Sequence, residues 1–314
     1  MSRRNDQELE FFLRDFGKRG FSTQSTQWQL SAYAKVNLGL WVAPRDNRGY
    51  HPVWSVMQSI SMADVIRVTP SSHYHVEMNV PLEQRQFVPS LANNLITRAY
   101  HGLKDQYPEI PTVKIQVNKH IPIGSGLGGG SADAAAILRW AQMVINKKID
   151  PKFAANLGVD VPFLISGGTA QATGYGEDLK YLHPLRGWYV VLVSPNFGLS
   201  TRHVYNAFDT LPNSSHLSIE SMQDVIRRLE LGSSPISLFN ALEPAAWKVE
   251  PKLKNLKADL RSVSRKPWFL TGSGATYFTL LRSYEESLAL QKDLVNRKMD
   301  NVAGIDIAEF VGPF

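Results

Sequence analysis

The segment at residues 124–131 reads Gly-Ser-Gly-Leu-Gly-Gly-Gly-Ser and carries the clearest chemical signal in the sequence. Glycine tolerates positive φ angles and has no side chain, so successive backbone N–H groups can turn inward around an anion. The Ala-rich segment that begins at Ser131 predicts a helix, and the positive end of its dipole would lie at the same point. A glycine loop that leads into a helix predicts a phosphate-binding site rather than a merely flexible surface loop.

Two common phosphate-binding motifs do not explain this segment. A P-loop requires a lysine where this sequence has Gly130. The spacing of Gly124, Gly126 and Gly129 matches the dinucleotide-binding fingerprint, and Asp150 lies at about the right distance downstream. That acid should end a second strand, but a proline and a helix pattern follow it. A dinucleotide-dependent oxidoreductase, which would bind NAD rather than ATP, is therefore the weaker hypothesis.

A lysine and an aspartate far from the loop would complete a site for phosphoryl transfer. Lys35 and Asn37 interrupt an apolar strand pattern, and Asp160 lies between apolar residues in the run Leu-Gly-Val-Asp-Val-Pro-Phe. A buried lysine is unfavourable unless an anion lies nearby, although a lysine at a strand edge reaches water and an isolated aspartate often caps a helix. Phosphoryl transfer to a hydroxyl needs a held donor, a cation that offsets its charge, and a base. The three features together predict that chemistry.

The elements that must position these residues follow an α/β pattern. A loop is expected at residues 160–168, a glycine turn within the apolar stretch 269–281, and a domain crossing near residues 167–177. Strands are expected at residues 28–40, 53–60, 64–69, 73–78, 112–118 and 188–193. Helices are expected at residues 94–106, 131–145, 201–208, 221–230, 253–263 and 284–297, with a short helix after Pro151.

Composition excludes several classes of protein. The chain has 314 residues, 43% of them hydrophobic, which is enough for two domains or one large one. No apolar run approaches the about 18 residues of a membrane-spanning helix, so we expect no membrane partner. The absence of cysteine excludes disulfides, zinc–thiolate sites, iron–sulfur clusters and a cysteine nucleophile. It also suits the cytoplasmic location that we expect.

Charge gives weaker information. The sequence has 34 Lys and Arg residues and 28 Asp and Glu residues, and this net charge of +6 favours anionic ligands but also fits an ordinary basic surface. The basic residues are scattered and lack interleaved aromatics, so we expect no nucleic-acid partner. His73 and His75 would share one strand face, where a solvated edge strand is a simpler explanation than a metal site.

Residues 1–27 differ in character from the remainder of the chain. They mix basic and acidic residues and lack an unbroken apolar centre, so neither a secretory signal nor an organelle transit peptide fits. Leu9, Phe12, Leu13 and Phe16 have helical spacing, which predicts a short amphipathic helix on a flexible leader.

The motifs together resemble the GHMP kinase superfamily. The resemblance rests on residues 34–40, 49–51 (Gly-Tyr-His), 122–135 and 157–163, and residues 271–276 (Thr-Gly-Ser-Gly-Ala-Thr) are similar to the third glycine motif of that superfamily. The likeness extends from about residue 31 to residue 281. Lys35 with Asn37, the Gly-Tyr-His run and the run around Asp160 are most similar to the branch that phosphorylates the cytidyl diphosphate of methylerythritol in non-mevalonate isoprenoid synthesis.

This resemblance implies an α+β, two-domain GHMP kinase fold. The N-terminal half would resemble domain 2 of ribosomal protein S5, and the C-terminal half would be an α/β sandwich. We expect a leader at residues 1–27, an ATP-binding domain at 28–171 and a substrate-side domain at 172–314, with a last helix that can return to the first domain. ATP and Mg²⁺ would be the cofactors, a small molecule the substrate, and a monomer or homodimer the assembly.

The resemblance also implies roles for individual residues. Asp160 would be the general base that takes the proton of the substrate's 2-hydroxyl, and Lys35 would pair with Asp160 and hold the acceptor oxygen. Asn37 would line the acceptor pocket, and the Ser131 hydroxyl would meet Mg²⁺. The residues that wrap the ATP phosphates would be Pro122, Gly124, Ser125, Gly126, Leu127, Gly128, Gly129, Gly130 and Ser131.

The cytidine end of the substrate would bind on the other side. His51 would hydrogen-bond cytosine and Tyr50 would stack on it, with Tyr205 rather than Phe197 as the second stacking ring. The alternative for Tyr50 and Tyr205 is that each ring only packs in the protein core. The remaining substrate-side residues would be Thr201, Gly272, Ser273 and Gly274.

The sequence departs from the family pattern at Trp41, Pro52 and Ala241, which puts substrate detail in doubt more than kinase activity. Two alternatives stay open at this point. One is another GHMP kinase that acts on homoserine, mevalonate or a sugar, which the Tyr-His pair disfavours. The other is a nucleotide-binding module without catalysis, which the presence of both Lys35 and Asp160 disfavours.

Overall fold

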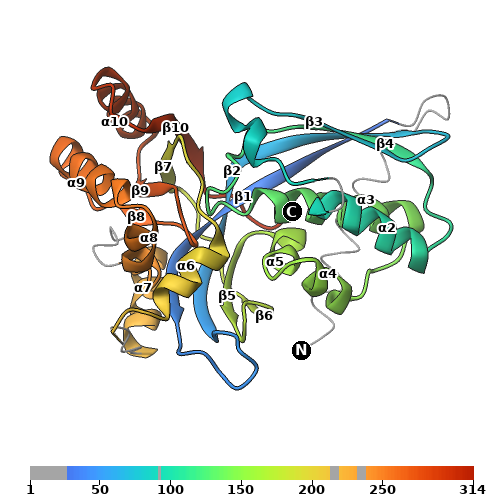
Figure 1. The fold of residues 1–314 in the computed structure, drawn as a ribbon, viewed down its shortest axis with the longest axis horizontal. Helices are drawn as coiled ribbons and strands as arrows, with labels where there is room; N and C mark the ends of the chain where they lie inside the picture. The colour runs from blue at the N-terminus through green and yellow to red at the C-terminus, as the bar shows by residue number, and fades with distance from the viewer. Residues whose placement is uncertain (1–26, 91–92, 213–218, 232–237) are drawn as a thin grey trace.

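Two β-sheets with helices packed on them form the part of the chain that the computed structural model describes, which is residues 27–90, 93–212, 219–231 and 238–314 (Figure 1). The helix expected around residues 9–16 lies outside these described residues. None of the helices in the described ranges is long and apolar enough to cross a membrane.

The first sheet is organised around one very long strand. β1 (Trp28–Val42) and β2 (Val53–Pro70) pair antiparallel over nearly their whole length. The other edge of β2 pairs with β4 (Val113–Asn118) near its end and with β5 (Thr169–Thr173) near its start. β3 (His75–Asn79) lies parallel to β4, and β6 (Asp178–Tyr181) extends the sheet beyond β5.

The expectation of two strands at residues 53–60 and 64–69 was therefore wrong. β2 runs unbroken through Ser61, Met62 and Ala63, although its register with β1 shifts between Tyr33 and Lys35 and again between Asn37 and Gly39. Such irregularities interrupt the alternation of apolar side chains without ending a strand.

Four helices cover one face of the first sheet: α2 (Leu95–Gln106), α3 (Gly129–Ile145), α4 (Pro151–Leu157) and α5 (Val161–Ser166), as Figure 1 shows. The alanines of α3 are fully buried, which lets the helix approach the sheet closely. A short 3-10 helix, η1 (Leu82–Phe87), follows β3. The loop expected at residues 160–168 instead contains α5, which begins after Asp160 with Pro162 in its first turn, a position that suits proline.

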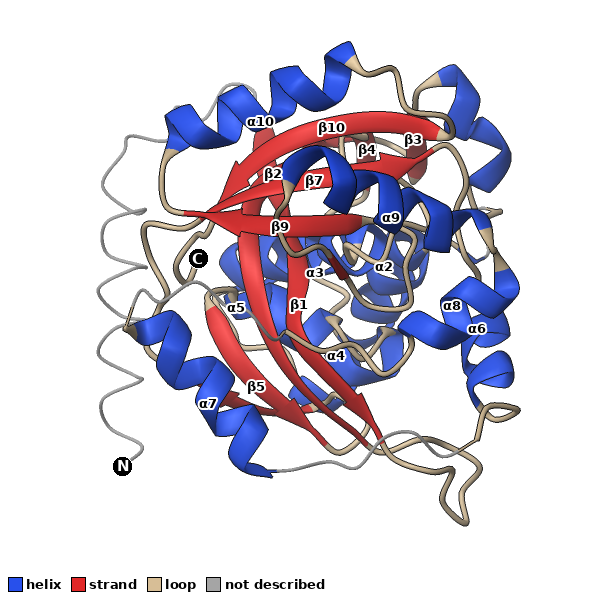
Figure 2. Ribbon diagram, turned by 90° about the vertical axis from the view of Figure 1, so that its left-hand side faces the viewer, coloured by secondary structure: helices blue, strands red, loops and turns tan. Residues whose placement is uncertain are grey.

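The second sheet has the order β10-β7-β9-β8, with antiparallel neighbours throughout. Its strands are β7 (Tyr189–Pro195), β8 (Phe269–Leu270), β9 (Tyr277–Leu281) and β10 (Val302–Glu309). Figure 2 shows α9 and α10 beside this sheet, with α6 and α8 nearby. These helices and α7 span Thr201–Phe208 (α6), Ile219–Glu230 (α7), Glu243–Val249 (α8), Lys252–Ser264 (α9) and Tyr284–Asn296 (α10).

The sequence pattern missed β5, β6, α8 and β10. β5 and β6 continue the first sheet as far as Tyr181, while the domain division between residues 171 and 172 stays a prediction. The last helix, α10, packs on the second sheet, and it is the segment after β10 that returns to the first half. There Phe310 bridges to Ile60 and Pro313 bridges to Gly167.

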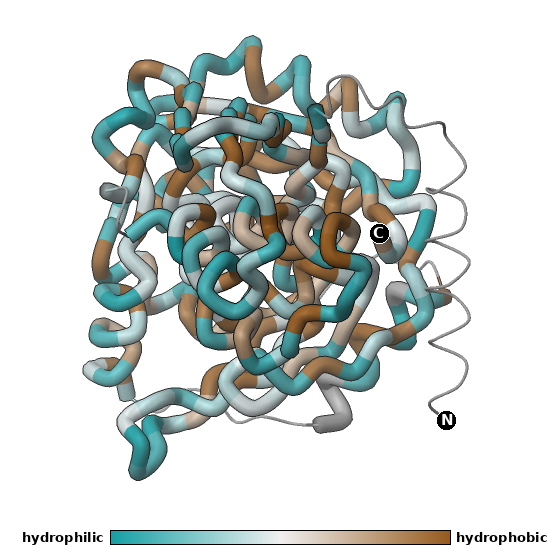
Figure 3. Tube along the Cα trace, turned by 90° about the vertical axis from the view of Figure 1, so that its right-hand side faces the viewer, coloured by the Kyte–Doolittle hydropathy of each residue, from teal (hydrophilic) through white to brown (hydrophobic). Residues whose placement is uncertain are grey.

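The apolar residues gather inside both halves, where Figure 3 shows the most hydrophobic segments surrounded by hydrophilic ones. One buried cluster lies between the first sheet and helices α2 to α5, and it includes Trp140 and Phe163. A second cluster lies between the second sheet and its helices, with Trp268 and Tyr277 at its centre. Lys35 and the glycines of the glycine loop lie outside these two cores, at a cavity that residues of both halves line.

Candidate active site

Lys35 and Asp160 lie together, although 125 positions separate them in the sequence numbering. The Lys35 Nζ is 3.3 Å from Asp160 Oδ2 and donates a 2.6 Å hydrogen bond to Asn37 Oδ1. The Lys35 side chain is 5% exposed and the Asp160 side chain 28%. A buried cation next to a partly open carboxylate leaves the acid accessible to a bound molecule.

Asp160 precedes the first residue of α5, but its side chain makes no capping hydrogen bond to that helix. The carboxylate is therefore available to Lys35, and helix capping does not account for this aspartate. Asn37 is fixed in turn, because its Nδ2 donates to Ser55 Oγ at 2.7 Å and Ser55 Oγ donates to the Gly39 carbonyl at 2.7 Å.

The glycine loop reaches the same place. Gly124, Gly126 and Gly128 have φ angles of +68°, +80° and +75°, and α3 begins at Gly129, two residues earlier than expected. The backbone N–H of Lys35 donates to the carbonyl of Leu127 at 3.0 Å, which ties β1 to the loop. The loop and the N-terminus of α3 thus face the Lys35–Asp160 ion pair.

A second glycine loop, residues 271–276, packs on the first one. Thr271 Oγ1 donates to the carbonyl of Gly126 at 3.3 Å and accepts from the backbone N–H of Asn37 at 3.1 Å. The Thr276 N–H donates to the Ser125 carbonyl at 3.0 Å. Thr201 Oγ1 and Ser273 Oγ share a hydrogen bond of 2.9 Å, which attaches α6 to this second loop.

Asn240 holds the second glycine loop from behind. Its Nδ2 donates to the carbonyls of Leu270 and Gly272, both at 2.8 Å, and its Oδ1 accepts from the Leu242 N–H at 2.9 Å. The residue after it, Ala241, is buried and departs from the family pattern without disturbing these bonds. The other departure in this region, Trp41, packs against Trp54 with ring centroids 4.7 Å apart.

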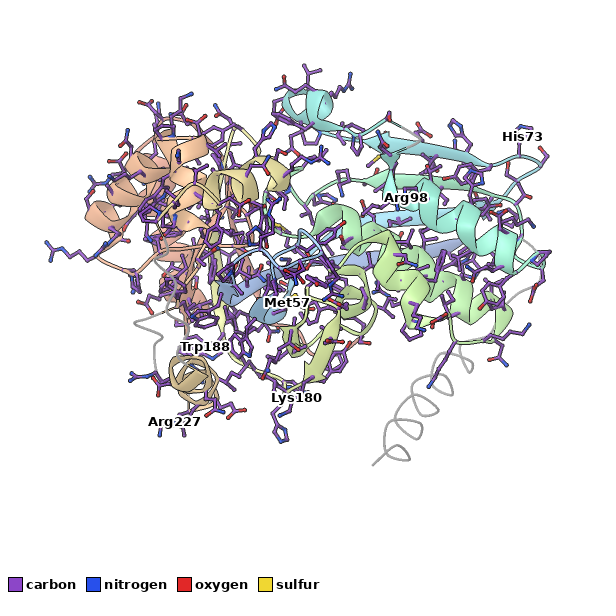
Figure 4. All side chains as sticks on the ribbon, turned by 60° about the horizontal axis from the view of Figure 1, so that its bottom comes forward. Met57, His73, Arg98, Lys180, Trp188 and Arg227 are labelled. Atoms are coloured by element: carbon purple, nitrogen blue, oxygen red, sulfur yellow. The ribbon has the colours of Figure 1, made fainter. Side chains whose placement is uncertain are left out.

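These elements enclose a cavity of about 400 Å³ between the two halves. Met57 on β2, labelled near the middle of the molecule in Figure 4, is one of its lining residues. The predicted site residues that line the cavity are Lys35, Asn37, Pro122, Gly124, Ser125, Gly126, Gly128, Gly129, Gly130, Ser131, Asp160, Thr201, Tyr205, Gly272, Ser273 and Gly274.

Three predicted site residues do not line the cavity. Leu127 is fully buried and contributes its carbonyl to β1. Tyr50 is 65% exposed, and its ring lies edge-on to that of Tyr175 at 5.7 Å. His51 is buried behind the cavity wall, with its ring 5.4 Å from that of Tyr205.

The His51 ring is hydrogen-bonded through one of its two nitrogens. Its Nδ1 donates to the Ala43 carbonyl at 2.8 Å, since a carbonyl only accepts. Its Nε2 is 3.0 Å from Asp209 Oδ1, in a geometry that makes no hydrogen bond, and Asp209 also pairs with Arg45. Burial, as the first cause, and the negative charge of Asp160 raise the pKa of Tyr205 to about 12. The Tyr205 hydroxyl therefore keeps its proton at neutral pH.

Sequence reasoning missed a buried charge cluster, two members of which, Lys119 and Asp133, also line the cavity. The Lys119 Nζ is 2.7 Å from Asp133 Oδ2 and also pairs with Asp64, and all three side chains are almost fully buried. Burial, opposed by the charge of Lys119, raises the pKa of Asp133 to about 7, and Asp133 Oδ1 has no hydrogen-bond partner. Asp133 lies two residues after the glycine loop in the sequence, and this closeness could have indicated it.

The end of the cavity near this cluster is largely apolar. Met78, Leu95 and Ile121 line it together with Asn94, whose side chain accepts from the Ile96 N–H at the start of α2. At the other end of the cavity lie Val53, Val159 and Tyr175. Tyr175 was also missed, because nothing in the sequence places the β5–β6 turn beside Asp160.

No group of three His, Cys, Asp or Glu residues that could hold a metal ion exists among the described residues. His73 lies at the far edge of the first sheet, away from the cavity (Figure 4).

Comparison with known proteins agrees with this arrangement. The family model described as "GHMP kinases N terminal domain" matches residues 94–170. The 4-diphosphocytidyl-2-C-methyl-D-erythritol kinase of Moorella thermoacetica is 37% identical over 257 residues, which are 79% of this chain and 88% of that relative. The enzyme of the same name from Desulfitobacterium hafniense is 35% identical over 266 residues, which are 83% of this chain and 89% of that relative.

Solved structures show the same likeness. A crystal structure of 4-(cytidine 5'-diphospho)-2C-methyl-D-erythritol kinase has a TM-score of 0.74 and 28% identity, and the match covers 91% of this chain and 100% of that chain. The homoserine kinase from Cytophaga hutchinsonii has a TM-score of 0.64 at 17% identity, covers 94% of this chain and 97% of its own, and shares the fold. The fold class expected from the sequence is confirmed.

Proposed function

Because the chain belongs to the 4-diphosphocytidyl-2-C-methyl-D-erythritol kinase family of GHMP kinases, we propose that it transfers the γ-phosphate of ATP to the 2-hydroxyl of 4-diphosphocytidyl-2-C-methyl-D-erythritol. The chain is an ATP-dependent small-molecule kinase, which its relatives' names establish. The 2-hydroxyl as acceptor and the roles of the site residues are our proposal.

The observation that supports this proposal most directly is the Lys35–Asp160 ion pair at the wall that also carries the glycine loop. A direct in-line transfer requires donor and acceptor in one cavity, with a base at the acceptor hydroxyl. A nucleotide-binding module without catalysis would not need a buried lysine beside an aspartate. The single cavity can therefore hold the phosphate donor and the hydroxyl acceptor side by side.

The donor phosphates fit the glycine loop. The N-terminus of α3 and the backbone N–H groups of residues 124–130 would bind the phosphate oxygens, as helix N-termini and glycine nests do. The Ser131 hydroxyl lines the cavity in the first turn of α3, and an oxygen donor of this kind suits Mg²⁺, which keeps waters and binds substrate phosphates. Mg²⁺ bound there with ATP would neutralise charge that develops on the phosphates.

The acceptor hydroxyl fits at Asp160. The carboxylate would take its proton as the oxygen attacks phosphorus, and Lys35 would hold the oxygen and offset negative charge. Asn37 would keep the Lys35 ammonium aligned through its 2.6 Å hydrogen bond, and Ser55 fixes Asn37. Every one of these side chains is carried by the paired strands β1 and β2 or by the start of α5.

The two nucleobases, the adenine of ATP and the pyrimidine of the acceptor, fit opposite ends of the cavity. The apolar end at Met78, Leu95 and Ile121 suits the adenine of ATP. The pyrimidine of the acceptor would lie at the wall formed by α6 and the β1–β2 hairpin, where Tyr205 lines the cavity and His51 supports it from behind. A cytoplasmic location and a monomeric or homodimeric state stay predictions.

Coupled turnover of ATP against a panel of acceptors tests the proposal. The cytidyl diphosphate of methylerythritol should support rapid ADP formation, while homoserine, mevalonate and a sugar should not. Phosphorus NMR of the product should show a new phosphomonoester on the tertiary carbon that bears the 2-hydroxyl. Rapid turnover of homoserine, mevalonate or the sugar instead of the cytidyl compound would contradict the substrate assignment and leave the kinase assignment intact.

A further inference from the structure

Arg139 on α3 joins the strand that carries Lys35 to the helix that follows Asp160. Its Nη1 donates to the Leu164 carbonyl in α5 at 2.6 Å, and its Nη2 donates to the Ser31 carbonyl in β1 at 2.7 Å. Burial lowers the pKa of Arg139 to about 10, so the guanidinium is still charged at neutral pH. One planar side chain thus connects β1 with α5, from outside the residues that line the cavity.

Phe314, in the segment after β10, makes a second connection between the same two elements. Its ring stacks on the Tyr33 ring of β1, with centroids 4.7 Å apart and planes at 26°. Its backbone N–H donates to the Ser166 carbonyl at the end of α5 at 2.9 Å, and Figure 1 shows the C-terminus beside this helix. The Arg139 guanidinium lies over the Phe314 ring, 5.0 Å from its centroid, which is a cation–π contact. Arg139 and Phe314 therefore support each other as well as β1 and α5.

The end of α5 accommodates the Phe314 ring because Gly167 has no side chain. A Cβ added at Gly167 would lie 2.5 Å from Phe314 Cζ, which is too close unless one of the two moves. Pro313 forms a β-bridge with Gly167, so the backbone before the ring is fastened at the same point. The ring therefore packs directly on the backbone that leaves α5.

α5 depends on such contacts because it is only six residues long, and a helix of this length is not stable by itself. Its buried apolar side chains attach one face to the core. Its last carbonyls have no partner inside the helix. Arg139 and Phe314 supply donors to two of them, those of Leu164 and Ser166. The two side chains thus fix the end of α5 that lies farthest from Asp160.

The position of α5 relative to β1 sets the geometry of the ion pair in the cavity. Tyr33 lies two residues before Lys35 in β1, and Asp160 directly precedes α5 without a capping bond from its side chain. A helix of this length spans about 9 Å, so a tilt of about 10° around its far end would move its start by about 1.5 Å. That displacement is large beside the 3.3 Å between Lys35 Nζ and Asp160 Oδ2. An error of about 1 Å at a reacting group can cost about 10²-fold in rate.

We infer that Arg139 and Phe314 are positioning residues for phosphoryl transfer: together they form a brace between β1 and α5 that holds the Asp160 carboxylate at the Lys35 ammonium. This inference rests on the proposed function, because it takes Asp160 as the base. Loss of the brace should lower kcat and leave the KM for ATP nearly unchanged, since the donor phosphates are placed at the glycine loop.

Steady-state kinetics with ATP and the cytidyl acceptor tests the brace. Phe314→Ala should lower kcat about tenfold to hundredfold and change the KM for ATP by less than about twofold. Arg139→Lys keeps the charge but lacks the planar fork that reaches two carbonyls, so its kcat should fall as well. Phe269→Ala is the matched control, because this half-buried ring also packs on another ring, that of Phe278, but lies in the second sheet and does not line the cavity. Its kcat should match that of the unmodified protein.

A double variant separates positioning from a general loss of folding. If the brace acts through Asp160, Phe314→Ala should lower kcat by less than about threefold in protein that already carries Asp160→Asn, because the group that the brace positions is gone. Equal losses with and without Asp160→Asn would overturn the inference, because Phe314 would then act on the fold as a whole. An unchanged kcat in Phe314→Ala alone would overturn it too.

Amide hydrogen exchange tests the brace without any turnover. The Leu164 N–H donates to the Asp160 carbonyl at 3.1 Å and so reports whether the first turn of α5 is closed. Its exchange should become at least about tenfold faster in Phe314→Ala and in Arg139→Lys, while the N–H groups of α4 keep their rates. Unchanged exchange at Leu164 would refute the brace. Failure of the unmodified protein to phosphorylate the cytidyl acceptor would contradict the proposed function alone, and the exchange rates would still decide whether the brace holds α5.

Discussion

The α-carbon of Gly126 faces the carbonyl oxygen of Thr271, so closely that an added Cβ would lie within the 3.0 Å that real Cβ atoms essentially never enter. The two glycine loops thus fit against each other as well as around a ligand. Gly126 also has a φ of +80°, which only glycine adopts easily. Glycine at this position is required by packing even before any phosphate binds.

Gly126→Ala should therefore lower the free energy of unfolding by at least about 2 kcal/mol, because strain at positive φ adds to the clash with Thr271. ATP affinity should fall as well, since the loop must move. Urea unfolding and calorimetry would measure the two effects. Gly130→Ala is the matched control for stability, because Gly130 is helical and its added Cβ meets only Leu95 Cδ1 at 3.8 Å. Equal stability of the two variants would contradict this account of the loop.

Asp160→Asn should lower kcat by about 10²- to 10⁴-fold, the usual contribution of a general base. The KM for ATP should change little, because we place the donor phosphates at the glycine loop rather than at Asp160. Steady-state kinetics on the cytidyl acceptor would measure both values. Asp150→Asn makes the same chemical change at the exposed N-cap of α4 and should keep full activity. A kcat for Asp160→Asn within tenfold of the unmodified value would remove Asp160 from its proposed role.

Asp133 should make stability depend on pH. Burial raises its pKa to about 7 from 3.8, so between these values the native state holds a proton that the unfolded state releases. The free energy of unfolding should then fall as pH rises through this window, by up to about 1.4 kcal/mol per pH unit from this group. In Asp133→Asn this contribution disappears, so Tm relative to the unmodified protein should rise between about pH 4 and about pH 7 and then stay level.

Thermal melts of both proteins across that pH range would test the Asp133 prediction. Asp105→Asn, an exposed aspartate on α2, serves as the control and should melt in parallel with the unmodified protein. Parallel curves for Asp133→Asn would mean that the buried carboxyl is ionised throughout, which its neighbour Lys119 would then have to support.

Asn240→Ala should weaken the site without touching a ligand. The change removes three hydrogen bonds and leaves the buried carbonyls of Leu270 and Gly272 without that partner. A loss of about 2–3 kcal/mol in the free energy of unfolding is expected, together with a lower kcat/KM because the second glycine loop is freed. Asn255→Ala, an exposed position on α9, is the control. Unchanged kcat/KM would show that the loop holds its shape without Asn240.

The sequence predicted those parts of the site that local patterns determine. A run of glycines before an Ala-rich helix has few structural alternatives, and Lys35 in an apolar strand requires a nearby anion, so both indicated a phosphate site. Tyr175 and the Lys119–Asp133–Asp64 cluster could not be predicted in this way. Their neighbours come from strands whose pairing, β2 with β5 and β2 with β4, no local pattern reveals.

The same reasoning explains where the fold was mispredicted. β2 was divided in two because its alternation falters near Ser61, where β2 has extra residues opposite β1 and the register shifts although the strand continues. α5 has only six residues, which is too few to show a helical repeat of apolar side chains, so this segment resembles a loop in the sequence. β10 carries half-buried side chains along most of its length, which leaves no clear two-residue alternation.

The return of residues 310–314 to the first half has a consequence for biosynthesis. Phe310 bridges to Ile60, the Val311 N–H donates to the Ser59 carbonyl, and Pro313 bridges to Gly167 at the end of α5. The N-terminal half is synthesised first, but it is completed only after residues 310–314 have been synthesised. Until then the strand carrying Ile60 and the helix that follows Asp160 lack these partners, and a nascent chain would be open to proteases and chaperones beside the carboxylate of Asp160.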